Sequence, residues 1–218
     1  MSSSVVTLIG DLVGSRTHPS RRAAQEELVR ALAGVNERVE TVQPLEPTIG
    51  DELQGVLTSV ADALRATLLL RLSLPEEMDV RCGLGVGPIE VVGASAYGLT
   101  QDGPAWWAAR DAVDAVKHGE RRTPSVRTRL QPSRTPQEDP SMLEHDAPTG
   151  LVNGYLLCRD QVVGGLDGRG RRLALGLLDG RTHADLAATE GISASAVSQR
   201  VRRDGLAALV ASAQAVSA

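Results

Sequence analysis

Hydrophobic and polar positions repeat in two different ways along the chain, and the change falls near residue 130. Before it, short apolar runs typical of strands alternate with segments whose apolar residues recur every three or four positions, as in helices. After it, only the helical period is found. The pattern predicts an α/β part followed by an all-α part.

Strands are predicted where apolar runs are short or have period two, and helices where the period is near 3.6. The predicted strands are 5–9, a strand and turn around 48–51, 79–87 with a return strand at 89–92, and 126–130. The predicted helices of this part are 19–41, a helix whose apolar face runs from Val60 to Leu72, and 104–117.

Residues 131–148 hold four prolines among polar residues, which is typical of a loop or linker. Helices are then predicted at 150–164, 168–178, 182–189 and 194–212. The expected domains are 1–130, a linker over 131–149, and a helical domain over 150–218.

Composition narrows the possible functions. The 218 residues suffice for two domains, and 42% are apolar, as in a globular protein with a core. Phenylalanine is absent and aromatics are only 2%, which argues against a platform that stacks single-stranded bases. Cys82 and Cys158 lie too far apart to predict a disulfide framework or a zinc site. Neither a signal peptide nor an apolar run of about 18 residues is found, so we expect a cytoplasmic protein without a membrane partner.

Charge is unevenly distributed. From Gly150 onward the chain has eight arginines and six acids, a net charge of +2. The net charge of the whole chain is −4, so the part before Gly150 carries −6. Arg200, Arg202 and Arg203 fall within four residues of each other. Local clustering of this kind suits contact with DNA phosphates.

Residues 182–205 carry a helix-turn-helix pattern. Ala187 is small where two helices would cross, Gly191 allows a left-handed turn, and Ser193 suits the N-cap of the second helix. The residues predicted to form the small core are Leu186, Ile192, Val197 and Val201.

The second helix of this pattern directs outward the polar and basic residue types that read base edges and hold phosphates in a major groove. Glu190 is unusual, because many such motifs have an apolar residue before the turn. An ordinary αα-hairpin with solvated arginines is the alternative, but the spacing followed by the arginine cluster favours double-stranded DNA as a partner. The segment resembles helix-turn-helix modules of bacterial transcription factors. The predicted DNA-binding residues are Ser193, Ser195, Ser198, Gln199, Arg200, Arg202 and Arg203.

Two aspartates follow glycines at the ends of predicted strands: Asp11 and Asp51. Carboxylates brought together at neighbouring strand ends can hold Mg²⁺, with further oxygens from water and phosphate. Gly14 and Ser15 are placed to lend backbone N–H groups to a polyphosphate. Each Gly-Asp pair taken alone is also what an ordinary turn contains.

Four segments, 10–15, 48–52, 80–88 and 102–110, have an order and spacing that resemble the catalytic domain of class III nucleotidyl cyclases, a palm-like domain with a ferredoxin-type core. The resemblance covers about residues 5–117, and the whole chain resembles the SatD family of bacterial proteins. It implies an α+β fold, Asp11 and Asp51 as metal ligands, and Arg110 as the arginine that stabilises the transition state. A homodimer is also implied, because cyclase-type sites lie between two subunits. The implied nucleotide- or phosphate-binding residues are Asp11, Leu12, Gly14, Ser15, Asp51 and Arg110.

Three departures argue against catalysis. Trp106 stands where the resemblance places the transition-state asparagine, Pro47 stands where it places the purine-selecting lysine, and no Lys-Gly segment follows the last strand to clamp the triphosphate. Donors aimed at the transferring phosphorus supply most of the rate of such reactions. We therefore expect a binding site without catalytic residues.

The sequence as a whole predicts a dimeric transcription regulator whose degenerate cyclase-like domain binds a purine nucleotide, with or without Mg²⁺, as effector. One alternative is an active nucleotidyl cyclase or related nucleotide enzyme regulated by its C-terminal helices. Another is a protein that binds DNA constitutively, with the palm as a dimerisation scaffold. No residue that would select adenine or guanine is recognisable.

Overall fold

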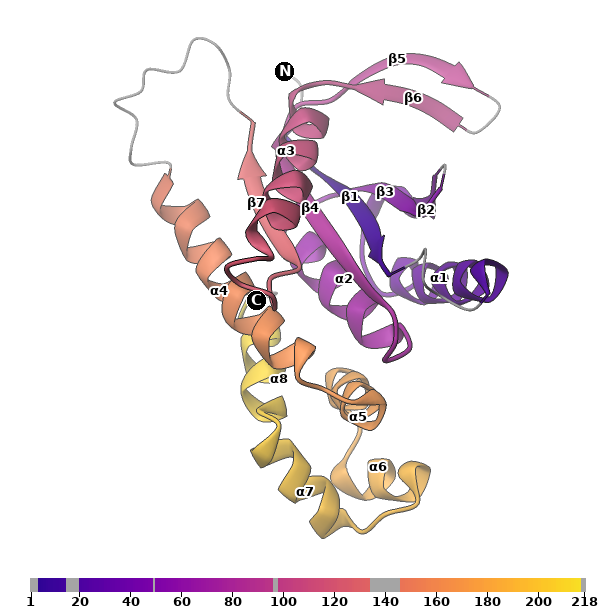
Figure 1. Cartoon of the computed structure of the whole chain (residues 1–218), viewed down its shortest axis with the longest axis vertical. Helices are drawn as coiled ribbons and strands as arrows, with labels where there is room; N and C mark the ends of the chain where they lie inside the picture. Colours follow the sequence, from indigo (N-terminus) through magenta and orange to yellow (C-terminus); the bar gives the residue numbers. More distant parts are fainter. Residues whose placement is uncertain (1–3, 15–19, 49, 96–97, 134–145, 217–218) are drawn as a thin grey trace.

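The computed structural model describes residues 4–14, 20–48, 50–95, 98–133 and 146–216, and is shown in Figure 1. Its main sheet has the strand order β2-β3-β1-β4-β7, and β5 and β6 form a separate two-stranded sheet. The strands are β1 (Val5–Val13), β2 (Thr41–Pro47), β3 (Glu52–Leu57), β4 (Asp79–Gly87), β5 (Glu90–Ser95), β6 (Gly98–Asp102) and β7 (Thr128–Pro132).

The first four strands of the main sheet form a ferredoxin-type βαββαβ core with helices α1 (Arg21–Asn36) and α2 (Val60–Ser73). The central strand β1 is antiparallel to both β3 and β4, and β7 adds to the edge parallel to β4. Each crossover joins two parallel strands that have one strand between them. The prediction of a mixed α+β fold is confirmed.

The two faces of β1 are covered by different helices. Val6, Leu8 and Leu12 point into the main core, which α1 and α2 close. Ile9 points to the other face, where α3 (Pro104–Gly119) packs on it through Ala109. Asp11 lies two residues after Ile9 and therefore shares the α3 face.

Helix α3 lies unusually close to β4, because two glycines of that strand leave room for its backbone. A Cβ on Gly85 would lie 1.9 Å from the carbonyl oxygen of Ala105, and one on Gly83 would lie 2.1 Å from that of Ala109. The side chain of Thr7 adds a hydrogen bond of 2.8 Å to the carbonyl of Ala105. These contacts fix where the polar side of α3 lies above the end of β1.

The C-terminal helices pack on the α/β part. They are α4 (Asp146–Gly164), α5 (Gly168–Leu178), α6 (His183–Glu190), α7 (Ala194–Arg203) and α8 (Leu206–Ala215), and α6 and α7 lie at the end of the molecule opposite the β5–β6 hairpin (Figure 1). Leu68 and Leu72 of α2 share a hydrophobic cluster with residues of α5, α7 and α8. The side chain of Asn153 in α4 forms two hydrogen bonds of 2.9 Å with the backbone of Leu130, which covers the edge of β7.

Three elements differ from the sequence-based prediction. Segment 89–92 does not return along β4, because β5 pairs with β6 instead. The helix predicted over 194–212 is two helices, since Gly205 adopts a left-handed φ of 70° between α7 and α8. Residues 48–51 connect two strands of a hairpin, β2 and β3. Among the described residues, no helix combines the length and apolar character needed to cross a membrane.

Candidate functional site

Two acidic residues face each other at one end of the sheet. Asp11 of β1 and Glu52 of β3 are directly opposed in the strand register. Like charges opposed in this way destabilise a sheet unless cations neutralise them. Helix α3 provides one cation for each acid, and β4 provides a further cation. The acidic pair is therefore part of a larger charged cluster.

Arg110 of α3 neutralises Glu52. Its guanidinium donates two hydrogen bonds, of 2.8 and 3.0 Å, to the two carboxylate oxygens. These bonds lower the pKa of Glu52 and raise that of Arg110. The arginine predicted to stabilise a transition state is therefore placed at the site, and in this arrangement it is paired with an acid.

Two cations approach the same oxygen of Asp11. Arg81 of β4 lies opposite Asp11 in the strand register and donates a hydrogen bond of 2.9 Å to its Oδ2. It also donates two hydrogen bonds, of 2.7 and 2.9 Å, to the carboxylate of Glu120. The Nζ of Lys117 in α3 lies 3.6 Å from the same Oδ2 and 3.9 Å from Asp114. The hydrogen bonds from Arg81 lower the pKa of Glu120.

The other predicted phosphate-binding residues lie around this cluster. Leu12 has a buried side chain, and its N–H donates to the carbonyl of Asp51 at 3.0 Å. Asp51 follows Gly50, which has a φ of 86° and forms the expected turn, whereas Asp11 lies within β1 and not in a turn. Gly14 has a φ of 75°, and its predicted contact with phosphate stays a prediction. Ser15 lies outside the described residues. The backbone bond between Leu12 and Asp51 joins β1 to the turn before β3.

Asp11, one of the two expected metal ligands, is already paired with cations in this arrangement. Its Oδ2 atom lies 2.9 Å from Arg81 and 3.6 Å from Lys117. Within the described ranges, no group of three or more His, Cys, Asp or Glu side chains is placed to hold a metal ion. The residues present therefore do not fit a resident Mg²⁺ as they stand.

Trp106, at the position expected for an asparagine, packs against Ile9, Ala109 and Val113 on the α3 face of the sheet. Its indole N–H is buried and has no hydrogen-bond partner among the described residues. Trp107 is 60% exposed, and its N–H donates to Asp102 at 2.8 Å. One tryptophan is thus a packing residue and the other lies on the surface, as the adjacent positions on a helix predict.

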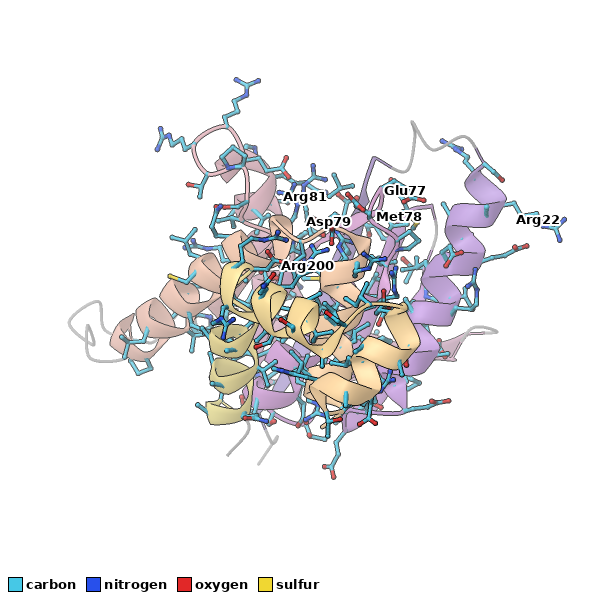
Figure 2. All side chains as sticks on the ribbon, turned by 90° about the horizontal axis from the view of Figure 1, so that it is seen from below. Arg22, Glu77, Met78, Asp79, Arg81 and Arg200 are labelled. Atoms are coloured by element: carbon cyan, nitrogen blue, oxygen red, sulfur yellow. The ribbon has the colours of Figure 1, made fainter. Side chains whose placement is uncertain are left out.

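A chain of ion pairs leads from this cluster to the C-terminal helices. Glu120 contacts Arg127, Arg127 contacts Asp79, Asp79 contacts Arg71, and Arg71 contacts Asp160 of α4, with distances between 2.8 and 3.1 Å. Figure 2 shows the neighbouring positions of Asp79 and Arg81 from below. None of these connections was predicted from the sequence, because each joins residues of different elements or loops and depends on how those elements pack.

Helices α6 and α7 meet at the predicted turn. Gly191 is left-handed with a φ of 65°, and the hydroxyl of Ser193 accepts the N–H of Ala196 as an N-cap. Val197 and Val201 are buried. Glu190, which departs from the usual pattern, forms ion pairs with Arg169 and Arg172 of α5 at 3.3 and 2.7 Å.

The predicted DNA-binding residues fall into two groups. Ser195, Gln199, Arg202 and Arg203 are exposed, and Ser198 is half-buried. Arg200 instead ties α7 to its neighbours through bonds to Asp167, the N-cap of α5, and to Asp204. Arg203 also pairs with Asp204.

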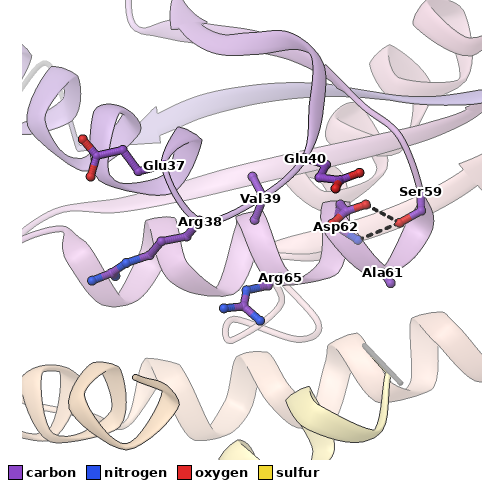
Figure 3. Close-up of a pocket in the computed structure, with 8 residues that line it drawn as sticks. All are labelled: Glu37, Arg38, Val39, Glu40, Ser59, Ala61, Asp62 and Arg65. Atoms are coloured by element: carbon purple, nitrogen blue, oxygen red, sulfur yellow. Dashed lines mark hydrogen bonds between the residues drawn. The ribbon is translucent and has the colours of Figure 1, made fainter. Parts of the chain in front are cut away.

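A hollow of about 520 Å³ lies where α1 leads into β2 and α2 begins (Figure 3), and no residue of the charged cluster or of α7 lines it. Some of its polar side chains already have hydrogen-bond partners, because Asp62 accepts hydrogen bonds from the hydroxyl groups of Ser59 and Thr58 at the start of α2. Charges of both signs line it, and it contains no residue predicted to bind a ligand. The lining residues are Glu37, Arg38, Val39, Glu40, Ser59, Ala61, Asp62 and Arg65.

The strand order defines a mixed α+β protein with a ferredoxin-type core, and comparison with known proteins identifies its family. The chain belongs to the SatD family, whose model matches residues 5–128. No curated protein matches the sequence significantly.

Solved structures give distant matches to the α/β part. A monomeric double mutant of the guanylyl cyclase domain of the RhoGC fusion protein from the aquatic fungus Blastocladiella emersonii is 18% identical, with a TM-score of 0.41, and the match covers 52% of this chain and 74% of that one. The guanylate cyclase domain of RhGC from Catenaria anguillulae, in complex with GTP, is 20% identical, with a TM-score of 0.39 and coverage of 52% and 73%. Likeness at this level carries no argument about function.

Proposed function

We propose that this protein is a DNA-binding regulator whose α6–α7 unit contacts double-stranded DNA and whose palm-like part binds a purine nucleotide as effector. The observation that carries the DNA-binding proposal is the division of α7 into two faces. The face with Val197 and Val201 is buried, whereas the opposite face is polar and basic. A helix of this kind, preceded by a tight turn, has the geometry that enters a major groove.

Within α7, Arg202 is the best candidate for a direct contact. It is exposed, and among the residues that the structure describes it forms no ion pair, whereas Arg200 and Arg203 do. The proposed contact residues are Ser195, Ser198, Gln199, Arg202 and Arg203. Ser193 and Arg200 are proposed to position α7, through its N-cap and through α5 respectively.

Replacing Arg202 by alanine is expected to weaken binding to a duplex selected from a random pool by about tenfold, because a charge-assisted contact is lost. The slope of log affinity against log salt should fall by about one phosphate contact. Fluorescence anisotropy at several salt concentrations measures both. Arg121→Ala removes the same charge from an exposed position after α3, and should change neither. Equal effects of the two substitutions would show that α7 does not contact DNA.

The nucleotide proposal rests on the charged cluster at the end of β1. Arg110 and Lys117 are partly exposed there, and the N–H of Leu12 in β1 donates to the carbonyl of Asp51 in the turn before β3. Backbone turns and cations together are what phosphate groups bind. The choice of a purine comes from the resemblance of residues 5–117 to nucleotidyl cyclases.

A homodimer is proposed to present two α7 helices to DNA half-sites. The exposed apolar side chains on and next to the β5–β6 hairpin support this. Val91 and Val92 of β5 are each 59% exposed, and Trp107 lies beyond the hairpin on α3. Large aromatic and aliphatic side chains of this kind anchor interfaces.

The proposed role of the β5–β6 hairpin as a dimer interface can be tested by placing a charge on it. Val91→Asp is expected to raise the dissociation constant of the dimer by about tenfold or more, because a carboxylate would be desolvated at the interface. Val42→Asp, a matched change at an exposed position of the edge strand β2, should leave it unchanged. Light scattering across a concentration series measures both. A monomeric wild type, or a Val91→Asp dimer of undiminished affinity, would contradict the assignment.

A further inference from the structure

Lys117 is the only lysine of the chain, and the other 22 basic residues among the 23 Lys and Arg are arginines. It lies within the charged cluster, with its Nζ 3.6 Å from Asp11. Lysine and arginine differ in their chemistry, since lysine carries a compact point charge with three donors that can turn to new acceptors. The single lysine is thus found where such a group would be useful.

Among the residues that the structure describes, the side chain of Lys117 donates no hydrogen bond. Its distances to Asp11 and Asp114, 3.6 and 3.9 Å, are those of ion pairs and exceed hydrogen-bond length. Arg81, by contrast, makes three hydrogen bonds of 2.9 Å or less. Lys117 is also 36% exposed, so an incoming anion can reach it.

Arg110 and Lys117 share one face of α3. They are seven residues apart, which is close to two helical turns and about 10 Å along the axis. Arg110 is 43% exposed and lies above Glu52, whereas Lys117 lies above Asp11. Each of the two opposed acids is therefore paired with one cation from this face of α3, and both cations are partly exposed.

The local charge balance limits the ligand. The cations and acids of the cluster are equal in number: Arg81, Arg110, Lys117 and Arg127 against Asp11, Glu52, Asp114 and Glu120. A triphosphate bound here without a metal would bring several negative charges to a cluster that is already neutral. A phosphate with one or two negative charges can be accommodated when Arg110 and Lys117 turn toward it.

We propose that Lys117 takes the place that a metal ion would have beside Asp11, and that Lys117 and Arg110 together bind the single phosphate of a purine nucleotide, as in a monophosphate or a cyclic nucleotide, without a divalent metal. The proposal rests on the nucleotide site proposed above and specifies its ligand class. Asp11 then serves to hold Lys117 in position while the site is empty.

Because Lys117 is the only side-chain amine, acetylation of the full chain reports directly on this site. The protein is treated with an amine-reactive acetyl ester in EDTA, alone or with GMP, AMP or the corresponding nucleoside. Mass spectrometry compares the rate at Lys117 with that at the N-terminal α-amine, which serves as an internal control. At a nucleotide concentration about ten times its dissociation constant, acetylation of Lys117 should slow about tenfold, with no protection by the nucleoside.

Calorimetry on the same samples distinguishes a wrong role for Lys117 from a wrong nucleotide proposal. Lys117→Gln should abolish binding of the monophosphate, and Lys117→Arg should retain part of it because the charge is kept. If wild type binds nucleotides but Lys117 is acetylated at an unchanged rate, or if binding requires Mg²⁺, the role of Lys117 is wrong and the nucleotide proposal stands. If no nucleotide binds with or without Mg²⁺, both are wrong.

Discussion

Replacing Gly85 by alanine is expected to lower the free energy of unfolding by about 3 kcal/mol, the upper end of the range for overpacking, because the added methyl would collide with α3. The new Cβ would lie 1.9 Å from the carbonyl oxygen of Ala105 and 2.5 Å from the nitrogen of Ala109. Both are backbone atoms, so no side chain can rotate away. Relief requires α3 to move off the sheet, and α3 carries Arg110 and Lys117.

Urea denaturation measures this effect, and Gly34→Ala provides the control. Gly34 lies inside α1 with nothing within 4 Å of an added Cβ. Alanine there should stabilise the protein by about 0.5–1 kcal/mol, because it favours the helix. If Gly85→Ala were as stable as wild type, the close seating of α3 on β4 would be incorrect, and so would the geometry of the charged cluster.

Replacing Asp160 by asparagine is expected to lower the free energy of unfolding by about 3–5 kcal/mol, the range for breaking a buried ion pair. Its side chain is fully buried in α4. Its carboxylate accepts hydrogen bonds from Arg71 and Arg159 and from the backbone N–H groups of Arg127 and Thr128, between 2.7 and 3.2 Å. Asparagine would leave two buried guanidinium groups without their shared counter-charge.

Asp179→Asn is the matched control for this substitution. Asp179 pairs with Arg38 at 3.2 Å, but both side chains are 38% exposed. An exposed pair contributes less than about 1 kcal/mol, so the loss should be small. Comparable losses in the two variants, measured by chemical denaturation, would mean that Asp160 is not the buried junction between α4, α2 and β7.

The buried junction also bears on how an effector could act. Arg159 and Asp160 bind elements of the α/β part directly, and α5 adds Arg171, whose guanidinium donates to carbonyl groups that include those of Leu74 and Met78. The helices are therefore packed on the palm rather than suspended from a linker. In the proposed dimer we therefore expect a ligand to change the arrangement of the two subunits.

Much of the fold follows from local patterns. The apolar runs and periods placed β1, α1, α2, β4 and α3, because the apolar residues of each are buried on one or the other face of the main sheet. The pairing of β5 with β6 was missed although the two strands are close in sequence, since the apolar pattern does not show whether a segment pairs with the strand before it or with the one after it. The break at Gly205 was missed because a glycine within a helical period is compatible with either continuation or a turn.

The candidate site was predicted only in part. Asp11 and Arg110 were found from motif spacing, and the structure places them in one cluster. Arg81, Lys117 and Glu120 were not found, because their roles depend on strand register and on the position of α3 above β1. The only sequence signal that could have drawn attention to Lys117 is that it is the single lysine among the 218 residues.

The most direct test of the central claim is the affinity of the full chain for its selected duplex, measured by fluorescence anisotropy with and without saturating purine nucleotide. Our account predicts that one nucleotide changes the dissociation constant by between about 5-fold and 150-fold, the usual range for coupled sites, and that Lys117→Gln removes the change while still binding DNA. DNA affinity that is identical in the absence and presence of every nucleotide would contradict it, and would leave the palm as a scaffold for dimerisation.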